Sequence, residues 1–432
     1  MHIAVVPHID ASLGGAFQYT LAMLDSLADI SQSRQEDRYT LIVRSERERR
    51  NFDQVTSRWE LAKFPFFTRD RFMDAIKTAV GQGWVREVIK QTAYQLTPAS
   101  DNNPDWIRSN GAGHRFMNRC AVDWVLYTTP NEQSFEMGIP YVMPIFDLQH
   151  RLQPEFPEVS ADGEWDRREY LYRNGTRGAM VILADSEIGK EDILNCYGSY
   201  GITPDRVKVL PYLSPPYLTS ESSQPERHRV RTTYRLPERY LLYPAQLWPH
   251  KNHMRLIQAL GQLKETKQAD AHIVLCGSYG GALRTNVYRD MMREAERLQV
   301  TDRIHYLGYV ANDAMSALYA EAVGLVMPTF FGPTNIPIME AWLCRCPVLT
   351  SDIRGIREQV GEAGLLVDPR SVEAIANGIS RLWNDETLRA DLSQRGIIRL
   401  RQYTKKDFSS KLADIVATAN RRAADLNLKR AA

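Results

Sequence analysis

The 432-residue sequence lacks the features that mark membrane-spanning, secreted and disulfide-bonded proteins. No apolar run approaches the roughly 20 residues of a transmembrane helix. The N-terminal stretch MHIAVVPHID has neither the basic segment nor the long apolar core of a signal peptide, and it favours a first strand instead. The five cysteines are scattered without Cys-x-x-Cys spacing. We therefore expect a cytoplasmic protein with reduced thiols.

The sequence also lacks a marked charge excess and the usual phosphate and metal signatures. A net charge of +2 does not favour a nucleic-acid partner. There is no Gly-x-x-x-x-Gly-Lys-Ser/Thr loop and no Gly-x-Gly-x-x-Gly motif, to which the stretch from Gly277 to Gly281 is only loosely related. No Asp-x-Asp pair is present to hold a divalent metal against a diphosphate. We expect no cofactor and no metal, so that lysine and backbone amides would have to neutralise any bound diphosphate.

Both halves of the chain alternate apolar, β-branched strands with amphipathic helices. Hydrophobic residues make up 44% and charged residues 25%, an ordinary globular mixture, and the length favours two domains. The pattern is typical of parallel sheets covered by helices, which predicts an α/β protein with two Rossmann-like, doubly wound domains that face a cleft. The expected strands are 2–6, 39–43, 124–127, 141–146 and 180–184, then 240–244, 271–275, 304–307, 324–327, 347–350 and 364–367.

A Pro/Ser-rich stretch near residues 213–225 divides the two series. We take residues 1–213 as the N-terminal domain and 214–407 as the C-terminal domain. A final charged helix, about 408–432, could pack back on the first domain.

Four loops at strand ends could hold a ligand, because ligands of such sheets lie at the carboxyl ends of the strands. Gly14 and Gly15 follow the first strand, where they form either a tight turn or a close approach to a ligand. Lys251 stands at the start of a helix for which Asn252 is a possible cap. A cation is unfavourable there unless it is solvated or an anion binds beside it.

The third loop runs from Phe331 to Glu340. Two prolines stiffen it, Gly332 allows close approach, and Thr334 and Asn335 add hydrogen-bonding groups. We expect Glu340 in the first turn of the following helix, where it either favours the helix dipole or accepts hydrogen bonds from two vicinal hydroxyls, such as those of a ribose.

The fourth loop follows the strand at 141–146 and carries Asp147 and His150. Both side chains could face the cleft. The alternative for His150 is a packed or surface histidine.

Together these features resemble the retaining GT-B glycosyltransferases of family 4. The resemblance rests on the order of the Gly-Gly loop, the lysine loop, LGYV, ALYAEAVGLVMPT, a loop ending Pro-x-x-Glu-Ala, and GLLVDP, and it is strongest over residues 238–385. The sequence FGPTN resembles that of a subgroup of bacterial polysaccharide glycosyltransferases within this family. The resemblance implies a nucleotide-sugar donor in the C-terminal domain, an acceptor in the N-terminal domain, and metal-independent transfer with retention.

Residue by residue, the resemblance implies that Lys251 binds the donor diphosphate, that Glu340 binds the ribose, and that Asp147 belongs to a His-Asp pair. At three positions this sequence departs from the family. Gly332 stands where the family has the first glutamate of the motif that ends at Glu340. Gln246 stands where the family has an arginine that binds the diphosphate, and Phe146 stands where it has the histidine of the His-Asp pair. The expected catalytic residues are Asp147, His150 and Lys251. The expected donor-binding residues are Gly14, Gly15, Gln246, Lys251, Gly277, Tyr309, Val310, Gly332, Thr334, Asn335, Ile336 and Glu340.

The predicted function is hexose transfer from a nucleotide-diphosphate sugar to a saccharide or lipid-linked acceptor in bacterial surface polysaccharide (O-antigen, capsule or lipopolysaccharide) biosynthesis. The alternatives are a nucleotide-sugar 2-epimerase on the same fold and a non-catalytic nucleotide-sugar-binding subunit. A helix near 72–84 and the charged run 44–50 leave peripheral contact with the inner face of the cytoplasmic membrane open. The base, the sugar, the linkage and the oligomeric state have no signature in the sequence.

Overall fold

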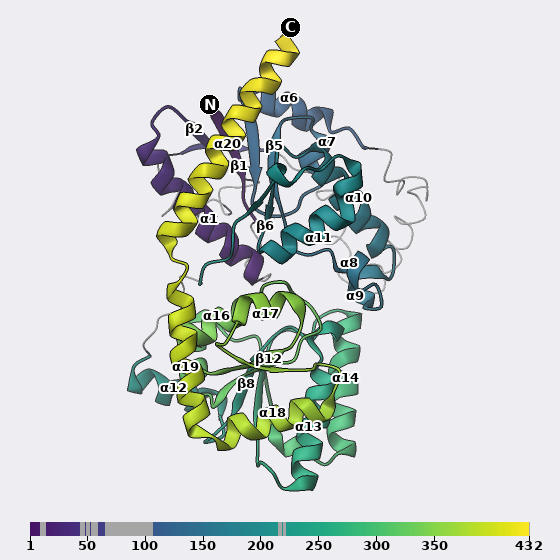
Figure 1. Ribbon diagram of the computed structural model, residues 1–432, viewed down its shortest axis with the longest axis vertical. Coiled ribbons are helices and arrows are strands. Elements are labelled where there is room, and N and C mark those ends of the chain that lie inside the picture. Colours follow the sequence, from purple (N-terminus) through teal and green to yellow (C-terminus); the bar gives the residue numbers. More distant parts are fainter. Residues whose placement is uncertain are drawn as a thin grey trace, which may run out of the picture.

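The computed structural model describes residues 1–8, 14–43, 48, 52, 59–64, 107–214, 218 and 222–431. The helix expected near 72–84 lies outside these residues, as does the run 44–50 apart from Glu48. Two α/β domains are stacked along the long axis of the molecule (Figure 1). Within the described ranges, no helix combines the length and the apolarity that a membrane crossing requires.

The N-terminal domain is built on a seven-stranded parallel sheet in the order β3-β2-β1-β4-β5-β6-β7. Its strands are β1 (His2–Val6), β2 (Arg38–Val43), β3 (Glu60–Lys63), β4 (Trp124–Tyr127), β5 (Tyr141–Ile145), β6 (Val181–Ala184) and β7 (Val207–Val209). Its helices are α1 (Gly15–Ser33), α6 (Gly111–Arg119), α7 (Gln133–Glu136), α8 (Gln149–Leu152), α9 (Pro157–Ser160), α10 (Glu164–Gly178) and α11 (Glu187–Tyr197), with the 3₁₀ turns η3 (Gly198–Tyr200) and η4 (Pro204–Arg206).

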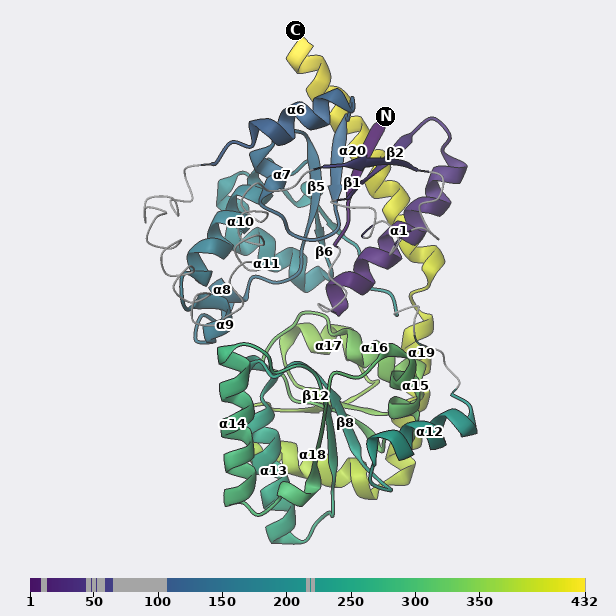
Figure 2. The same cartoon turned by 180° about the vertical axis from the view of Figure 1, so that it is seen from behind.

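The C-terminal domain repeats this plan with a six-stranded parallel sheet in the order β10-β9-β8-β11-β12-β13. Its strands are β8 (Leu241–Pro244), β9 (Ile273–Cys276), β10 (Ile304–Gly308), β11 (Gly324–Met327), β12 (Val348–Ser351) and β13 (Leu365–Val367). Its helices are α12 (Gln224–Tyr234), α13 (His253–Thr266), α14 (Ala282–Arg297), α15 (Asn312–Glu321), α16 (Ile336–Leu343), α17 (Arg354–Val360), α18 (Val372–Asn384) and α19 (Glu386–Arg401), with η5 (Pro249–Lys251) and η6 (Thr301–Arg303). Helices α13 and α14 lie side by side on this sheet, as Figure 2 shows from behind.

The expected fold class is therefore confirmed, and each sheet reverses its strand order beside its first strand. Those reversals lie between β1 and β4 and between β8 and β11. Ligands of doubly wound sheets bind beyond the carboxyl ends of the strands at such switch points.

The N-terminal sheet separates two apolar layers because its side chains alternate between the two faces. Ile3 and Val5 of β1 pack in one layer, whereas Ala4 and Val6 pack in the other. Each layer is covered by helices, which explains why every residue of β1 is buried.

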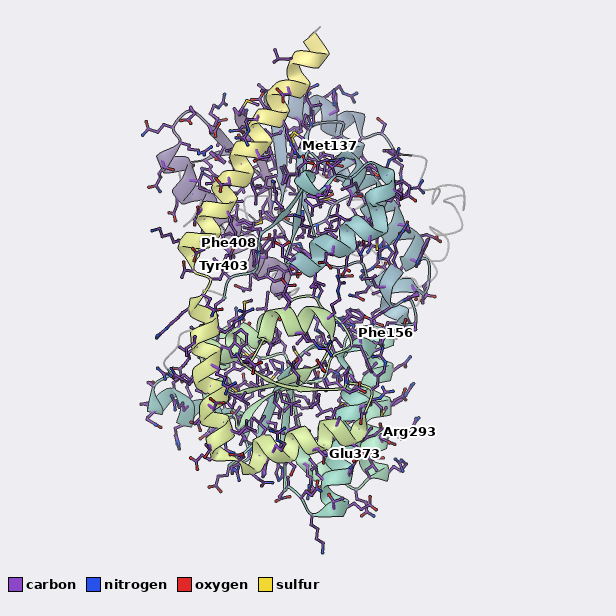
Figure 3. All side chains as sticks on the ribbon, viewed as in Figure 1. Met137, Phe156, Arg293, Glu373, Tyr403 and Phe408 are labelled. Carbon is purple, nitrogen blue, oxygen red and sulfur yellow. The ribbon has the colours of Figure 1, made fainter. Side chains whose placement is uncertain are left out.

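The last helix, α20 (Lys405–Ala431), belongs structurally to the N-terminal domain. The chain leaves α19 in the C-terminal domain, crosses near Tyr403, and enters α20, which runs beside α1 (Figures 1 and 3). An apolar stripe at helical spacing joins the layer of Ile3 and Val5: Phe408, Leu412, Ile415, Val416, Ala419 and Ala423. Asn420 adds polar contacts, because it hydrogen-bonds both Trp124 and Asp37.

Candidate functional site

Two adjoining cavities lie where the carboxyl ends of the two sheets face each other. Cavity A, of about 730 Å³, is lined by the ends of β8, β9 and β10 and the start of α16. Cavity B, of about 750 Å³, is lined by the loops after β5, β8 and β11. Both domains contribute to both cavities, and the two share Gly14, Gly15, Phe146, Tyr212, Gln246, Thr334 and Asn335.

Cavity A depends on a glycine at the end of β9. Gly277 has φ 145°, and a Cβ there would stand 2.2 Å from the carbonyl oxygen of Ala245. Only glycine lets the chain pass so close to the end of β8. Beside it, the Tyr309 side chain is 74% exposed at the end of β10, while Val310 is buried.

The loop between β11 and α16, residues 328–335, is held by hydrogen bonds from α17 and by one within the loop. The side chain of Gln359 bonds both the backbone N–H and the carbonyl of Asn335, each at 2.8 Å. Asn335 in turn donates from Nδ2 to the carbonyl of Gly332. Gly332 has φ 121°, and a Cβ there would lie 2.8 Å from Asn335. The loop conformation therefore disfavours any side chain at position 332.

Glu340 does not lie in the first turn of α16, as the sequence led us to expect. It is the fifth residue of the helix, and therefore stands in the second turn. The residue is 6% exposed, lines cavity A, and accepts a hydrogen bond of 2.6 Å from the hydroxyl of Tyr319.

Lys251 ends the 3₁₀ turn η5 and lines cavity B. Its Nζ lies 3.5 Å from Oδ1 of Asn335. Burial lowers its pKa to about 8, although the charges of Glu158 and Asp147 oppose this shift. A half-buried ammonium of this kind favours an anionic ligand, which would restore its charged form.

Asn252 occupies the N-cap position of α13 but does not cap the helix with its side chain. Its backbone is left-handed, and its Nδ2 donates to the carbonyls of Pro328 and Pro369 at 2.8 Å each. Asn252 thus ties the lysine loop to the loop that precedes α16.

Asp147 follows β5 and lines cavity B as expected for the fourth loop. Its Oδ1 accepts hydrogen bonds from Arg168 at 2.9 Å and from the backbone N–H of Gln149 at 3.1 Å.

The expectation that His150 faces the cleft is wrong. The short helix α8 turns His150 back into the domain, where it is fully buried and lines neither cavity. Its Nε2 lies 2.9 Å from Glu169 and 3.2 Å from the hydroxyl of Tyr197. Burial raises the pKa of Glu169, but hydrogen bonds from Arg151, His150 and Tyr197 outweigh it and hold that pKa at about 2. This packed histidine therefore belongs to a structural network.

The sequence did not single out Arg284, which extends from the first turn of α14 into cavity A. Its Nη1 donates to Oε1 of Gln246 at 2.8 Å, and its guanidinium lies 4.7 Å from the centre of the Trp248 ring. Among the described residues, Arg284 is the only lysine or arginine that lines cavity A. No local spacing reveals it, because Gln246 stands 38 residues away along the chain.

Glu158 of α9 is a second residue that the sequence did not single out, and it reaches across the domain interface into cavity B. Its Oε1 accepts hydrogen bonds from the backbone N–H of His250 at 2.9 Å and from the ring Nδ1 at 2.5 Å. Burial lowers the pKa of His250 to about 4, so the ring is neutral near pH 7 and donates Nδ1–H. The Phe331 ring stacks on that of His250 at 3.8 Å, and Phe156, labelled at the domain boundary in Figure 3, packs against Phe331.

All twelve expected donor-binding residues line cavity A or cavity B, and so do two of the three expected catalytic residues, Asp147 and Lys251. In the described ranges, no group of three or more His, Cys, Asp and Glu side chains is arranged to hold a metal ion. The two cavities can thus offer cations, carboxylates and backbone groups to a polar ligand that extends from one to the other.

Comparison with known proteins relates this chain to glycosyltransferases. Residues 225–399 match the model of the family "Glycosyl transferases group 1". The chain is 29% identical over 277 residues to the O-antigen chain mannosyltransferase B of Escherichia coli, an alignment that covers 61% of this chain and 70% of the relative. It is 25% identical over 291 residues to a D-inositol 3-phosphate glycosyltransferase of Corynebacterium glutamicum, covering 64% and 68%.

Solved glycosyltransferase structures share the fold over nearly the whole chain. HepE of Anabaena, solved with UDP and glucose, superposes with a TM-score of 0.64 at 19% identity, covering 97% of this chain and 100% of HepE. WaaG, a glycosyltransferase involved in lipopolysaccharide biosynthesis, superposes with a TM-score of 0.60 at 16% identity, covering 96% and 99%. The chain thus has the GT-B fold, and the family match of its C-terminal domain together with its relatives supports a group 1 glycosyltransferase.

Proposed function

We propose that this protein is a retaining, metal-independent glycosyltransferase of family 4. It moves a hexose from a nucleotide-diphosphate sugar to a hydroxyl of a saccharide or lipid-linked acceptor in bacterial surface polysaccharide biosynthesis. The observation that carries the proposal is the convergence of all twelve expected donor-binding residues on two adjoining cavities. The O-antigen mannosyltransferase relative supports a polysaccharide role, and the UDP and glucose of HepE support a nucleotide-sugar donor.

The donor extends from cavity A into cavity B. The nucleoside occupies cavity A, where its base meets the backbone of Tyr309 and Val310 and its ribose hydroxyls donate to Glu340. The diphosphate lies where the cavities join, beside the amides of Gly14 and Gly15. The hexose then enters cavity B.

Two cations serve the diphosphate. Lys251 reaches the diphosphate from cavity B. Arg284 reaches it from cavity A, where its guanidinium lies beside the side chain of Gln246. Arg284 thereby provides the guanidinium that an arginine at position 246 would provide. Arginine suits the role because its fork of donors matches phosphate oxygens.

Stabilisation of the negative charge on the leaving diphosphate lowers the barrier of the reaction. The bond between the anomeric carbon and the phosphate oxygen breaks, and negative charge grows on the departing diphosphate. Lys251, Arg284 and fixed backbone amides stabilise that charge without reorganising, which is typically worth several kcal/mol of barrier. The acceptor hydroxyl forms the new bond on the face that the diphosphate leaves, and its proton passes to a phosphate oxygen. Asp147 lies on the acceptor side of cavity B.

A thermal-shift panel tests this proposal. UDP, GDP, dTDP and their hexose conjugates are each added to wild type and to Lys251→Ala, with EDTA and again with Mg²⁺. A ligand at 100 times its dissociation constant adds about 2.7 kcal/mol to the free energy of unfolding. We expect the nucleotides of one base to raise the melting temperature of wild type equally in EDTA and in Mg²⁺, and to raise that of Lys251→Ala much less. A panel without any stabilising nucleotide would refute the donor site.

A further inference from the structure

We infer that Glu158 contacts the sugar that is transferred, and that its Oε2 accepts hydrogen bonds from hydroxyls of the donor hexose. This inference rests on the proposed function, which supplies the nucleotide-diphosphate sugar. It adds a residue of the N-terminal domain to sugar recognition.

The geometry of Glu158 leaves one carboxylate oxygen for a ligand. Its side chain is only 6% exposed, and Oε1 is committed to two N–H groups of His250. Oε2 is buried and has no hydrogen-bond partner among the described residues, while the residue lines cavity B. Buried polar atoms are nearly always paired, so an orphaned carboxylate oxygen in a cavity indicates a missing donor.

The carboxylate is ionised when the donor arrives. Burial raises the pKa of Glu158, but the hydrogen bonds from His250 outweigh this effect and leave the pKa below its ordinary value. An ionised carboxylate can only accept hydrogen bonds. The ligand group at Oε2 must therefore be a donor.

The surroundings identify that donor as a hydroxyl. A phosphate would be repelled by Glu158, and Lys251 of the same cavity is better suited to it. A sugar offers several hydroxyls, and each can donate one hydrogen bond.

Among the described residues that line cavity B, Glu158 is also the one carboxylate that no arginine holds. The other two are Asp147, which binds Arg168, and Glu164, which binds Arg167 and Arg168. In the same cavity, the backbone conformation of Gly332 disfavours a side chain at that position.

Glu158 is held across the boundary between the two domains. Its anchor, His250, belongs to the C-terminal domain and is fixed by the Phe331 ring. Such preorganisation lets a carboxylate bind hydroxyls without first losing side-chain freedom. The hexose therefore meets a carboxylate that both domains position.

The test uses Glu158→Gln, because its amide oxygen can still accept both hydrogen bonds from His250 while the other atom becomes a donor. Titration calorimetry gives dissociation constants for UDP, GDP and dTDP and for their hexose conjugates. We expect about tenfold weaker binding of the sugar nucleotide and a change below about twofold for the free diphosphate. The matched control is Glu155→Gln, which alters an exposed carboxylate three residues away.

A second measurement separates contact from structure. Donor analogues that lack one sugar hydroxyl are titrated against wild type and Glu158→Gln. If Glu158 binds that hydroxyl, removing the hydroxyl weakens donor binding by wild type but changes donor binding by Glu158→Gln little, so the effects of the two changes on affinity are not additive. Additive losses for every hydroxyl would overturn the inference, as would equal weakening of sugar nucleotide and free diphosphate.

The outcomes also separate this inference from the proposed function. If no diphosphate binds wild type, the donor site itself is refuted, and the inference falls with it. If wild type binds sugar nucleotides and Glu158→Gln binds them equally well, only the assignment of Glu158 fails.

Discussion

Donor binding should weaken as the pH rises through 8, because the ammonium of Lys251 is easily lost there. Burial lowers the pKa of this lysine to about 8 in the free protein. Its protonated fraction therefore falls from roughly 90% near pH 7 to roughly 10% near pH 9, and a diphosphate that needs the charged form loses about tenfold in affinity, or about 1.4 kcal/mol. The sign follows from linkage: the bound diphosphate raises the lysine pKa, so binding above pH 8 takes up a proton.

The assay compares wild type with Lys251→Arg by calorimetric titration with the sugar nucleotide selected in the panel. The sugar nucleotide is preferable to the free diphosphate, whose terminal phosphate itself titrates near pH 6. A guanidinium stays charged throughout, so the variant should show a flat profile between about pH 7 and 9, whatever its absolute affinity. His250 does not interfere, because its pKa is about 4. A flat wild-type profile, or an equal slope in Lys251→Arg, would refute the reasoning.

Two further predictions concern Arg284 and Asp185. Arg284→Ala should weaken binding of the nucleoside diphosphate about tenfold, which is the lower end of the effect of losing a charge-assisted hydrogen bond. Arg293 lies on the outer side of the same helix (Figure 3), so Arg293→Ala should change the affinity little. Equal titration results for both variants would contradict the role of Arg284. Burial raises the pKa of Asp185 to about 7, so its contribution to stability is complete below its unfolded pKa and is lost as the pH rises through 7. Between about pH 5.5 and 8 the free energy of unfolding should fall by about 2 kcal/mol through this group. The melting temperature should therefore fall more over this range in wild type and in the exposed control Asp166→Asn than in Asp185→Asn. An equal fall of the melting temperature with pH in all three proteins would contradict the assignment.

Strands and loops were predictable where the physical cause is local. The run YLLYP around β8 is continuously apolar because both faces of its sheet are covered, and it is followed by turn-forming residues. The short strands β3 and β7 were missed because their sequences, ELAK and VKV, mix charged and apolar residues at the sheet edges. Parallel pairing then brings loops that are far apart in the sequence to one edge, which explains why the expected donor-binding residues share two cavities.

The remaining site features depend on contacts that no local pattern encodes. Arg284 joins Gln246 across 38 residues, and Glu158 joins His250 across 92. His150 looked accessible because it follows a strand end, yet the turn of α8 directs it to Glu169. The sequence left open whether the final charged helix packs back on the first domain, and in the structure its residues Phe408 and Leu412 complete the N-terminal core.

The contacts that join the two domains are unequal in strength, and the stronger ones surround cavity B. Arg354 pairs with Asp192 at 2.7 Å, but its side chain is 50% exposed, and such surface pairs contribute about 0–1 kcal/mol. His250 and Glu158 are 10% and 6% exposed, and the rings of Phe156, Phe330 and Phe331 pack beside them. Solvent screens the buried pair much less. A hexose bound by Glu158 would therefore lie beside the interface that holds the domains together, so sugar recognition and exclusion of water from the reaction become a single event.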